Sequence, residues 1–192
     1  NSTIRRNMPG SEIFTAPNNV NGTFTVFGPI AFAGEVLRGM KWVINENEID
    51  LDQLEILIDE EDPVEYTRTL EKVKAELTKD EGARFIGELG IGTNPVIQGP
   101  QINAVLAEKK LGFHLAAGDS YGIYNEKPYA DGKWVRVDNG NESDLHFDLS
   151  SASYTGLTMK LDGELFMVNG VFVKPDGDPD PQLAYISAST AI

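Results

Sequence analysis

The spacing of apolar residues predicts one clear helix in the first half of the chain. Four of them recur at the intervals that place side chains on one face of a helix: Tyr66, Leu70, Val73 and Leu77. Asp62 can cap the N-terminus, Pro63 suits the first helical position, and Glu65 completes a capping-box pattern. Six charged residues lie off this stripe, so we expect a helix that packs one face on a core.

The rest of the N-terminal half predicts short strands joined by irregular segments. Residues 23–27 and 40–44 are rich in β-branched and aromatic residues, and each run is expected to form a strand. Residues 45–61 are acidic with apolar residues between the charges, which fits either a strand or a short helix. Residues 1–22 and the glycine-rich residues 82–99 predict irregular connections.

The C-terminal third predicts a three-stranded antiparallel meander. The dipeptides Asp162-Gly163 and Asn169-Gly170 separate apolar runs and are typical of two-residue hairpin turns. The expected strands are residues 157–161, 164–168 and 171–173. The acidic tail after Lys174 predicts a loop followed by one short strand at most. These elements together predict a single α+β domain with a mixed or antiparallel sheet, few helices and a C-terminal β-meander.

The composition fits a folded protein and argues against two classes of partner. The chain has 192 residues, of which 41% are hydrophobic, so it can bury a core. The absence of Cys excludes disulfides and thiolate metal sites. A formal charge of −14 argues against nucleic-acid and anionic lipid partners, because both require a basic face.

The sequence predicts a cytoplasmic protein that does not insert into a membrane. No apolar run approaches the roughly 20 residues of a membrane span. The first ten residues contain no apolar stretch of the kind found in a signal peptide.

Residues 144–149 carry the most informative pattern of polar side chains. On a strand, the apolar residues of this run share one face and the polar ones share the other: Leu145, Phe147 and Leu149 against Asp144, His146 and Asp148. One of only two histidines in the chain is therefore flanked by carboxylates on a rigid element. The polar face is either a solvated surface or a metal-binding or catalytic site.

Other candidate residues have both an ordinary and a functional interpretation. His114 lies among small residues, and it is either a hydrogen-bonded core histidine or part of a site with room for a ligand. Glu12 precedes a proline-rich turn and Glu88 lies between glycines, so each is either an exposed loop carboxylate or a buried functional group. Tyr121 follows His114 on the next loop and is a packing residue when considered alone.

Several segments in order resemble one known family. They are residues 7–17, 20–23, 80–88 and 114–121, then His146-Phe147-Asp148, Asp162-Gly163-Glu164 and Asn169-Gly170. This series resembles the catalytic half of the M29 metallo-aminopeptidases, the thermophilic or aminopeptidase T/S family. The resemblance extends from Asn7 to Val173 and includes both histidines of the chain.

The resemblance implies a two-metal hydrolase. The family's ligands fall on Glu12, Glu88, His114, Tyr121, His146 and Asp148. Such carboxylate, imidazole and phenolate groups suit two divalent ions, Zn²⁺, Co²⁺ or Mn²⁺. The implied reaction is hydrolysis of the N-terminal peptide bond of a peptide with a free N-terminus, through an activated bridging water. Glu108 is a candidate for moving a proton to the leaving amine.

The family also sets expectations for the whole molecule. Residues 1–192 would form the metal-binding catalytic domain, without the α/β domain that precedes it in the family. A homodimer is expected, because the family assembles through this half. One alternative is a metal-binding or dimerisation module that is inactive without the missing domain. A second is an acidic hydrolase, such as a glycosidase, that uses paired carboxylates and no metal.

Overall fold

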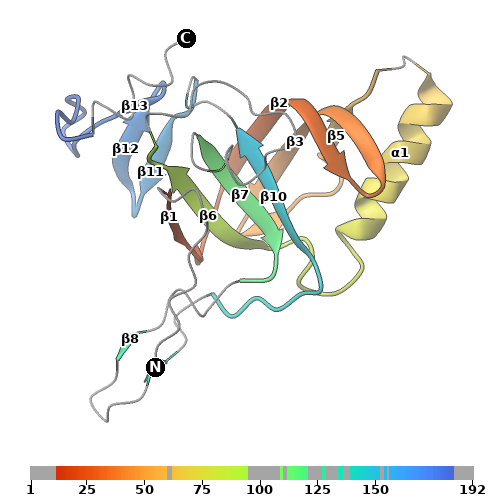
Figure 1. Ribbon diagram of the computed structural model, residues 1–192, viewed down its shortest axis with the longest axis horizontal. Coiled ribbons are helices and arrows are strands. Elements are labelled where there is room, and N and C mark those ends of the chain that lie inside the picture. The colour runs from red at the N-terminus through yellow and green to blue at the C-terminus, as the bar shows by residue number, and fades with distance from the viewer. Residues whose placement is uncertain are drawn as a thin grey trace. The chain divides into compact units, whose positions relative to one another are not determined.

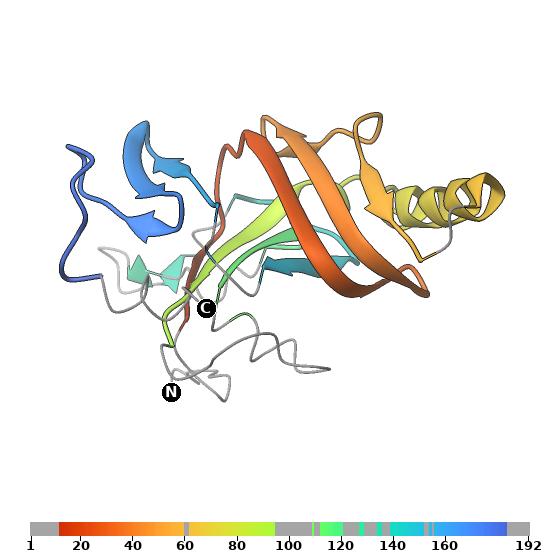
Figure 2. The same cartoon turned by 90° about the horizontal axis from the view of Figure 1, so that it is seen from above.

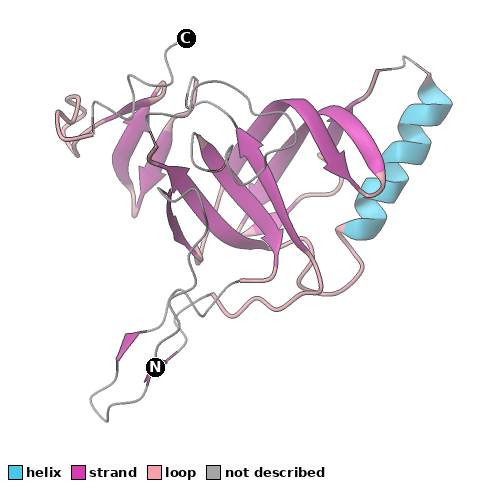
Figure 3. Ribbon diagram, viewed as in Figure 1, coloured by secondary structure: helices cyan, strands magenta, loops and turns pink. Residues whose placement is uncertain are grey.

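A computed structural model describes residues 12–59, 62–94, 109, 112–120, 127–128, 134–135, 139–151, 154 and 156–183. Strands dominate these residues, and they contain a single helix (Figure 3). The predicted α+β fold class is therefore confirmed. No helix in the described part of the chain is long and apolar enough to cross a membrane. The chain divides into two compact units: residues Phe14–Leu89 with Leu115–Leu149 form one, which we call the hairpin unit, and the remainder forms the other.

A long hairpin and two short strands build one sheet of the hairpin unit. The antiparallel strands β2 (Gly22–Phe32) and β3 (Glu35–Asn45) form the hairpin, and β4 (Glu48–Ile49) and β5 (Glu55–Leu57) both pair with β3. Both strands predicted here are confirmed, and each is longer than its apolar run. The acidic stretch adopts the strand alternative. The hairpin supplies much of the core: Phe24, Val26, Leu37, Met40, Trp42 and Ile44.

The predicted helix is α1 (Pro63–Glu76), which lies next to β5 (Figures 1 and 2). The Asp62 side chain accepts a hydrogen bond from the Val64 N–H, which confirms Asp62 as the N-cap. The Glu65 carboxylate pairs with Arg68 instead of the Asp62 N–H, so the predicted capping box is wrong. Val73 and Leu77 are completely buried, which confirms the apolar stripe as the packing face.

Four strands form the sheet that carries the candidate site, in the order β1, β6, β7, β10. Their bounds are Glu12–Thr15, Ile86–Gly92, Phe113–Gly118 and His146–Ser151. The irregular connections predicted for residues 1–22 and 82–99 are therefore wrong at residues 12–15 and 86–92, which form β1 and β6. All of β6 is buried, so its sequence shows no polar alternation.

Two glycines of β6 allow close packing rather than irregular backbone. A Cβ atom added to Gly87 would lie 2.2 Å from the Gly118 carbonyl oxygen. A Cβ atom added to Gly90 would lie 2.0 Å from Cε1 of His114. Both distances are shorter than any real contact, so each glycine marks a close approach to a neighbouring strand.

The C-terminal meander is confirmed as β11 (Met159–Leu161), β12 (Glu164–Val168) and β13 (Val171–Phe172). Positive φ angles at both residues of each turn match the predicted two-residue hairpins: Asp162 51°, Gly163 85°, Asn169 48° and Gly170 82°. A separate pair consists of β8 (Lys127–Pro128) and β9 (Trp134–Val135). In the tail, Val173 and Pro179 form an isolated bridge.

Candidate metal centre

Strand β10 presents two candidate ligands on one face because its side chains alternate. His146 and Asp148 share a face, and the His146 Nε2 atom lies 3.7 Å from the Asp148 Oδ1 atom. Phe147 points to the opposite face, where its ring stacks on Phe32 at 3.9 Å and meets the edge of Trp42 at 6.1 Å. Within β10 the predicted alternation is confirmed for His146 and Asp148 on one face and Phe147 on the other. Packing of Phe147 in the core fixes the face from which His146 projects.

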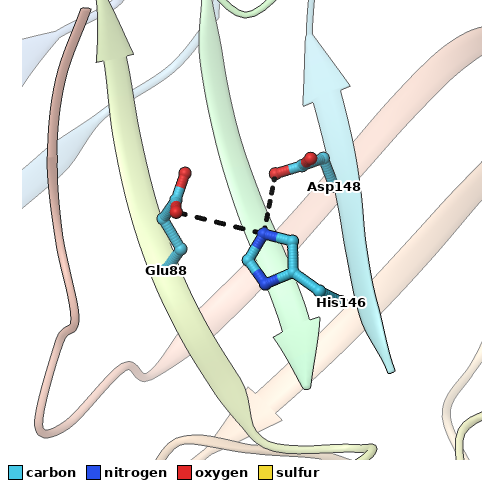
Figure 4. Close-up of side chains that lie close together, drawn as sticks. All are labelled: Glu88, His146 and Asp148. Atoms are coloured by element: carbon cyan, nitrogen blue, oxygen red, sulfur yellow. Dashed lines mark ion pairs between the residues drawn. The ribbon is translucent and has the colours of Figure 1, made fainter. Parts of the chain in front are cut away.

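Glu88 on β6 completes a group of three side chains (Figure 4). Its Oε2 atom lies 3.9 Å from His146 Nε2, although β7 separates β6 from β10 in the sheet. Two strand spacings amount to about 10 Å, so long side chains must reach towards each other above β7. Both central alanines of β7, Ala116 and Ala117, are fully buried, and whichever faces the site contributes only a methyl group.

The three side chains form a group that could hold a metal ion. Their ligand atoms all lie within 4.8 Å of one another, and 13% of the His146 side chain, 17% of Asp148 and 6% of Glu88 are exposed. Two donors that each lie about 2.0–2.2 Å from a zinc ion are at most about 4.3 Å apart. The separations of 3.7 and 3.9 Å satisfy this limit. Two carboxylates and an imidazole suit Zn²⁺, Co²⁺ or Mn²⁺.

A backbone hydrogen bond orients the His146 ring for this role. Nδ1 of His146 lies 2.8 Å from the carbonyl oxygen of Asp119. A carbonyl oxygen only accepts, so Nδ1 must carry the proton and donate it. In the neutral ring the lone pair is then on Nε2, which is the atom that faces Glu88 and Asp148. Histidine ligands of metals are held in this way.

Asp80 fixes the segment that leads into β10. Its carboxylate accepts hydrogen bonds from the Ser143 hydroxyl and from the backbone N–H groups of Gly82 and Asp144. Burial acts against the charged form, but these bonds outweigh it and hold the pKa of Asp80 below its ordinary value of 3.8. The Ser143 hydroxyl also accepts from the N–H of Leu145, the residue before His146.

The structure brings together only part of the predicted ligand set. Glu88 is a buried strand residue, so its interpretation as an exposed loop carboxylate is wrong. Asp144 precedes β10 and is exposed, which corrects the expectation that it shares the strand face of His146 and Asp148. Glu12 and His114 belong to the other unit, so their assignment to the same centre stays a prediction. Tyr121 and Glu108 lie outside the described residues.

Two asparagines that the sequence patterns did not single out are hydrogen bonded around this centre. The Nδ2 atom of Asn139 donates to the carbonyl oxygens of Pro17 at 2.8 Å and Ile86 at 2.7 Å. The Nδ2 atom of Asn141 donates to those of Gly82 at 2.9 Å and Gly118 at 2.6 Å. The Asn139-Gly140 dipeptide signals a turn, but nothing in it signals these distant acceptors.

The fold and the three ligand atoms define an α+β protein with a candidate metal centre. No family model and no curated protein matches the sequence. Among solved structures, the chain is similar to wild-type AmpT from Thermus thermophilus, with a TM-score of 0.51 and 23% identity. The match covers 77% of this chain and 34% of AmpT, so the chain spans about a third of that protein. At this identity the similarity shows the fold alone.

Proposed function

We propose that this chain is a metal-dependent aminopeptidase of the M29 type, or the metal-binding catalytic portion of one. The observation that carries the proposal is the group formed by Glu88, His146 and Asp148, with Nε2 of His146 directed at both carboxylates. The ordered motifs that resemble the aminopeptidase T/S family support it. The fold similarity to AmpT is consistent with it.

The described residues would hold a cation in a largely water-excluded position. Glu88 and Asp148 would neutralise its charge, and His146 would bind it through Nε2, held by the Asp119 carbonyl. A divalent ion in such a site supplies polarisation of a carbonyl and activation of water. The partial exposure of His146 and Asp148 leaves an approach for a substrate.

The proposal extends to residues that the family implies. Glu12, His114 and Tyr121 would be further ligands of the two-metal site that the resemblance implies, and Glu108 would move the proton to the leaving amine. The proposed substrate is a peptide with a free N-terminus. The proposed assembly is a homodimer.

Metal titration of paired variants tests the proposal. Asp148→Ala should lower the affinity of the full chain for Zn²⁺ or Co²⁺ by at least about a hundredfold, because it removes a ligand of low exposure. Asp144→Ala is the matched control, since its carboxylate is exposed four positions before Asp148 and its bond to Asp80 uses the backbone N–H. Equal metal affinity of Asp148→Ala and the wild type would contradict the ligand assignment.

Turnover separates the enzyme from a binding module. The metal-loaded chain should hydrolyse an aminoacyl anilide, and a chelator should abolish the activity. Metal binding without turnover would favour the alternative of a metal-binding or assembly module. Hydrolysis that persists in chelator, with no metal bound, would favour a carboxylate hydrolase.

A further inference from the structure

Asn141 connects the segment before β6 to the end of β7. Its amide donates to the carbonyl oxygens of Gly82 and Gly118 at once. A Cβ atom added to Gly82 would lie 2.0 Å from the Glu142 carbonyl oxygen, and one added to Gly118 would lie 2.0 Å from that of Leu145. The backbone segments therefore meet around Asn141 without space for further side chains.

Asn139 makes the corresponding connection on the side of β6. Its amide donates to Ile86, which lies two positions before Glu88, and to Pro17. Its Oδ1 atom accepts from the N–H of Asn141 at 3.1 Å. The donor and the acceptor of the Asn139 side chain are both used, so Asn139 holds Asn141 in register with β6.

The contacts of Asn141 lead directly to the imidazole of His146. The Gly118 carbonyl that Asn141 binds belongs to the peptide group joined to Asp119, and the Asp119 carbonyl accepts from His146 Nδ1. The Asp119 N–H donates to the Leu145 carbonyl at 2.7 Å, next to His146. The Ser120 N–H donates to the Asn141 carbonyl at 3.1 Å. Segment 118–120 is thus fixed on both sides by the asparagine and by the start of β10.

We propose that Asn141 is a positioning residue, which sets the orientation and tautomer of His146 by fixing the Asp119 carbonyl. The proposal rests on the proposed function in that it assigns His146 as a metal ligand. A primary amide suits this task, because it supplies two N–H donors without a charge that would compete for a cation. Asn141 is proposed to act through Asp119, not as a ligand of the cation.

The tautomer of His146 in the metal-free protein gives a direct test. The chain has only two histidines, so a long-range ¹H–¹⁵N spectrum of histidine-labelled protein is simple, and His146→Gln assigns the signals. The wild type should show the Nδ1–H tautomer at His146. Asn141→Ala and Asn141→Asp should shift it towards Nε2–H, since the first removes both donors and the second opposes a carboxylate to two carbonyl oxygens.

Metal affinity provides the second readout. Both Asn141 variants should bind Zn²⁺ about 10–100-fold more weakly than the wild type, the range observed when a group that orients a ligand is removed. Asn45→Ala and Asn45→Asp are matched controls at an exposed strand position and should change neither readout.

Two results would overturn the proposal. One is an Nε2–H tautomer at His146 in the wild type, a result that does not depend on an Asn141 variant folding. The other is an unchanged tautomer and unchanged affinity in Asn141→Ala. A wild type that holds the Nδ1–H tautomer, loses it in Asn141→Ala and takes up no metal would contradict the proposed function while supporting the orienting role of Asn141.

Discussion

Asp80 carries a partly exposed carboxylate that accepts hydrogen bonds from two separate segments of the chain. It joins the turn before β6 to the segment before β10 through Gly82, Ser143 and Asp144. All three groups donate to the carboxylate of Asp80, so the hydrogen bonds favour its ionised form. Asp80 therefore connects the acid–base state of the protein to the segment that carries His146.

Replacement of Asp80 should affect stability in a pH-dependent way. Because the pKa of Asp80 is lowered in the folded state, its stabilisation is fully present above the unfolded value of about 3.8 and is lost as the pH falls through the folded value. At pH 7, Asp80→Asn should lower the free energy of unfolding by roughly 1–2 kcal/mol. Urea unfolding from pH 7 to pH 2 measures how this difference declines.

Asp52→Asn controls for the change in net charge, since Asp52 is exposed. It should show little difference from the wild type at any pH. A stability difference for Asp80→Asn that stays constant down to pH 2 would contradict the role of the ionised carboxylate.

For individual residues, the sequence predicts those positions that depend on one strand alone. Alternation in residues 144–149 is enough to place His146 and Asp148 together, because neighbouring positions of one strand fix their separation. It cannot place Glu88, which arrives from β6 across an intervening strand. Nor can it find Asn139 or Asn141, whose acceptors are backbone carbonyls that leave no mark in the sequence.

Helix α1 is an element that can be predicted from its own residues. Its capping residue and its apolar stripe are both visible in the sequence, and both have the predicted roles. Thr69 adds a buried residue to the packing face that hydrophobicity alone did not indicate.

Two valines of α1 provide a matched pair for measuring its packing. Val73→Ala should lower the free energy of unfolding by about 1–3 kcal/mol, because the side chain is fully buried. Val64→Ala should change it by less than about 0.5 kcal/mol, because 76% of Val64 is exposed. Urea unfolding measures both. Equal losses would mean that α1 does not pack through the stripe.

Strand β6 shows why other elements escape prediction. A strand that is covered on both faces has no alternation, and its glycines indicate a loop when neighbouring strands are unknown. Gly87 and Gly90 are required only because Gly118 and His114 come close to them in the folded chain. The information that identifies this strand therefore lies in other segments.

For the molecule as a whole, metal binding and folding should be linked. Glu88 and Asp148 come from segments far apart in the sequence, so the three ligand atoms converge only in the folded chain. A cation that binds only the folded state raises the free energy of unfolding according to its concentration.

Thermal unfolding measures this linkage. Zn²⁺ at about 100 times its dissociation constant should add about 2.7 kcal/mol of stability and raise the Tm by roughly 5–10 °C. A chelator should reverse the shift, and the shift should decrease in acid because protons compete with the metal for its ligands. Asp148→Ala should show no shift, and a shift of wild-type size in that variant would place the metal elsewhere.

The asparagine pair also has a consequence for the chemical lifetime of the protein. Asn139 precedes Gly140, a sequence in which the backbone nitrogen can reach the side-chain carbonyl and expel ammonia, because glycine offers no steric hindrance. In the folded chain the amide of Asn139 is held by Pro17 and Ile86, away from that reaction. Each local unfolding event breaks these hydrogen bonds and frees the Asn139 side chain. Slow deamidation would then replace the donating amide of Asn139 with a carboxylate that faces two carbonyl oxygens. The modified chains would accumulate a negative charge at a position beside the candidate site where these two oxygens oppose it.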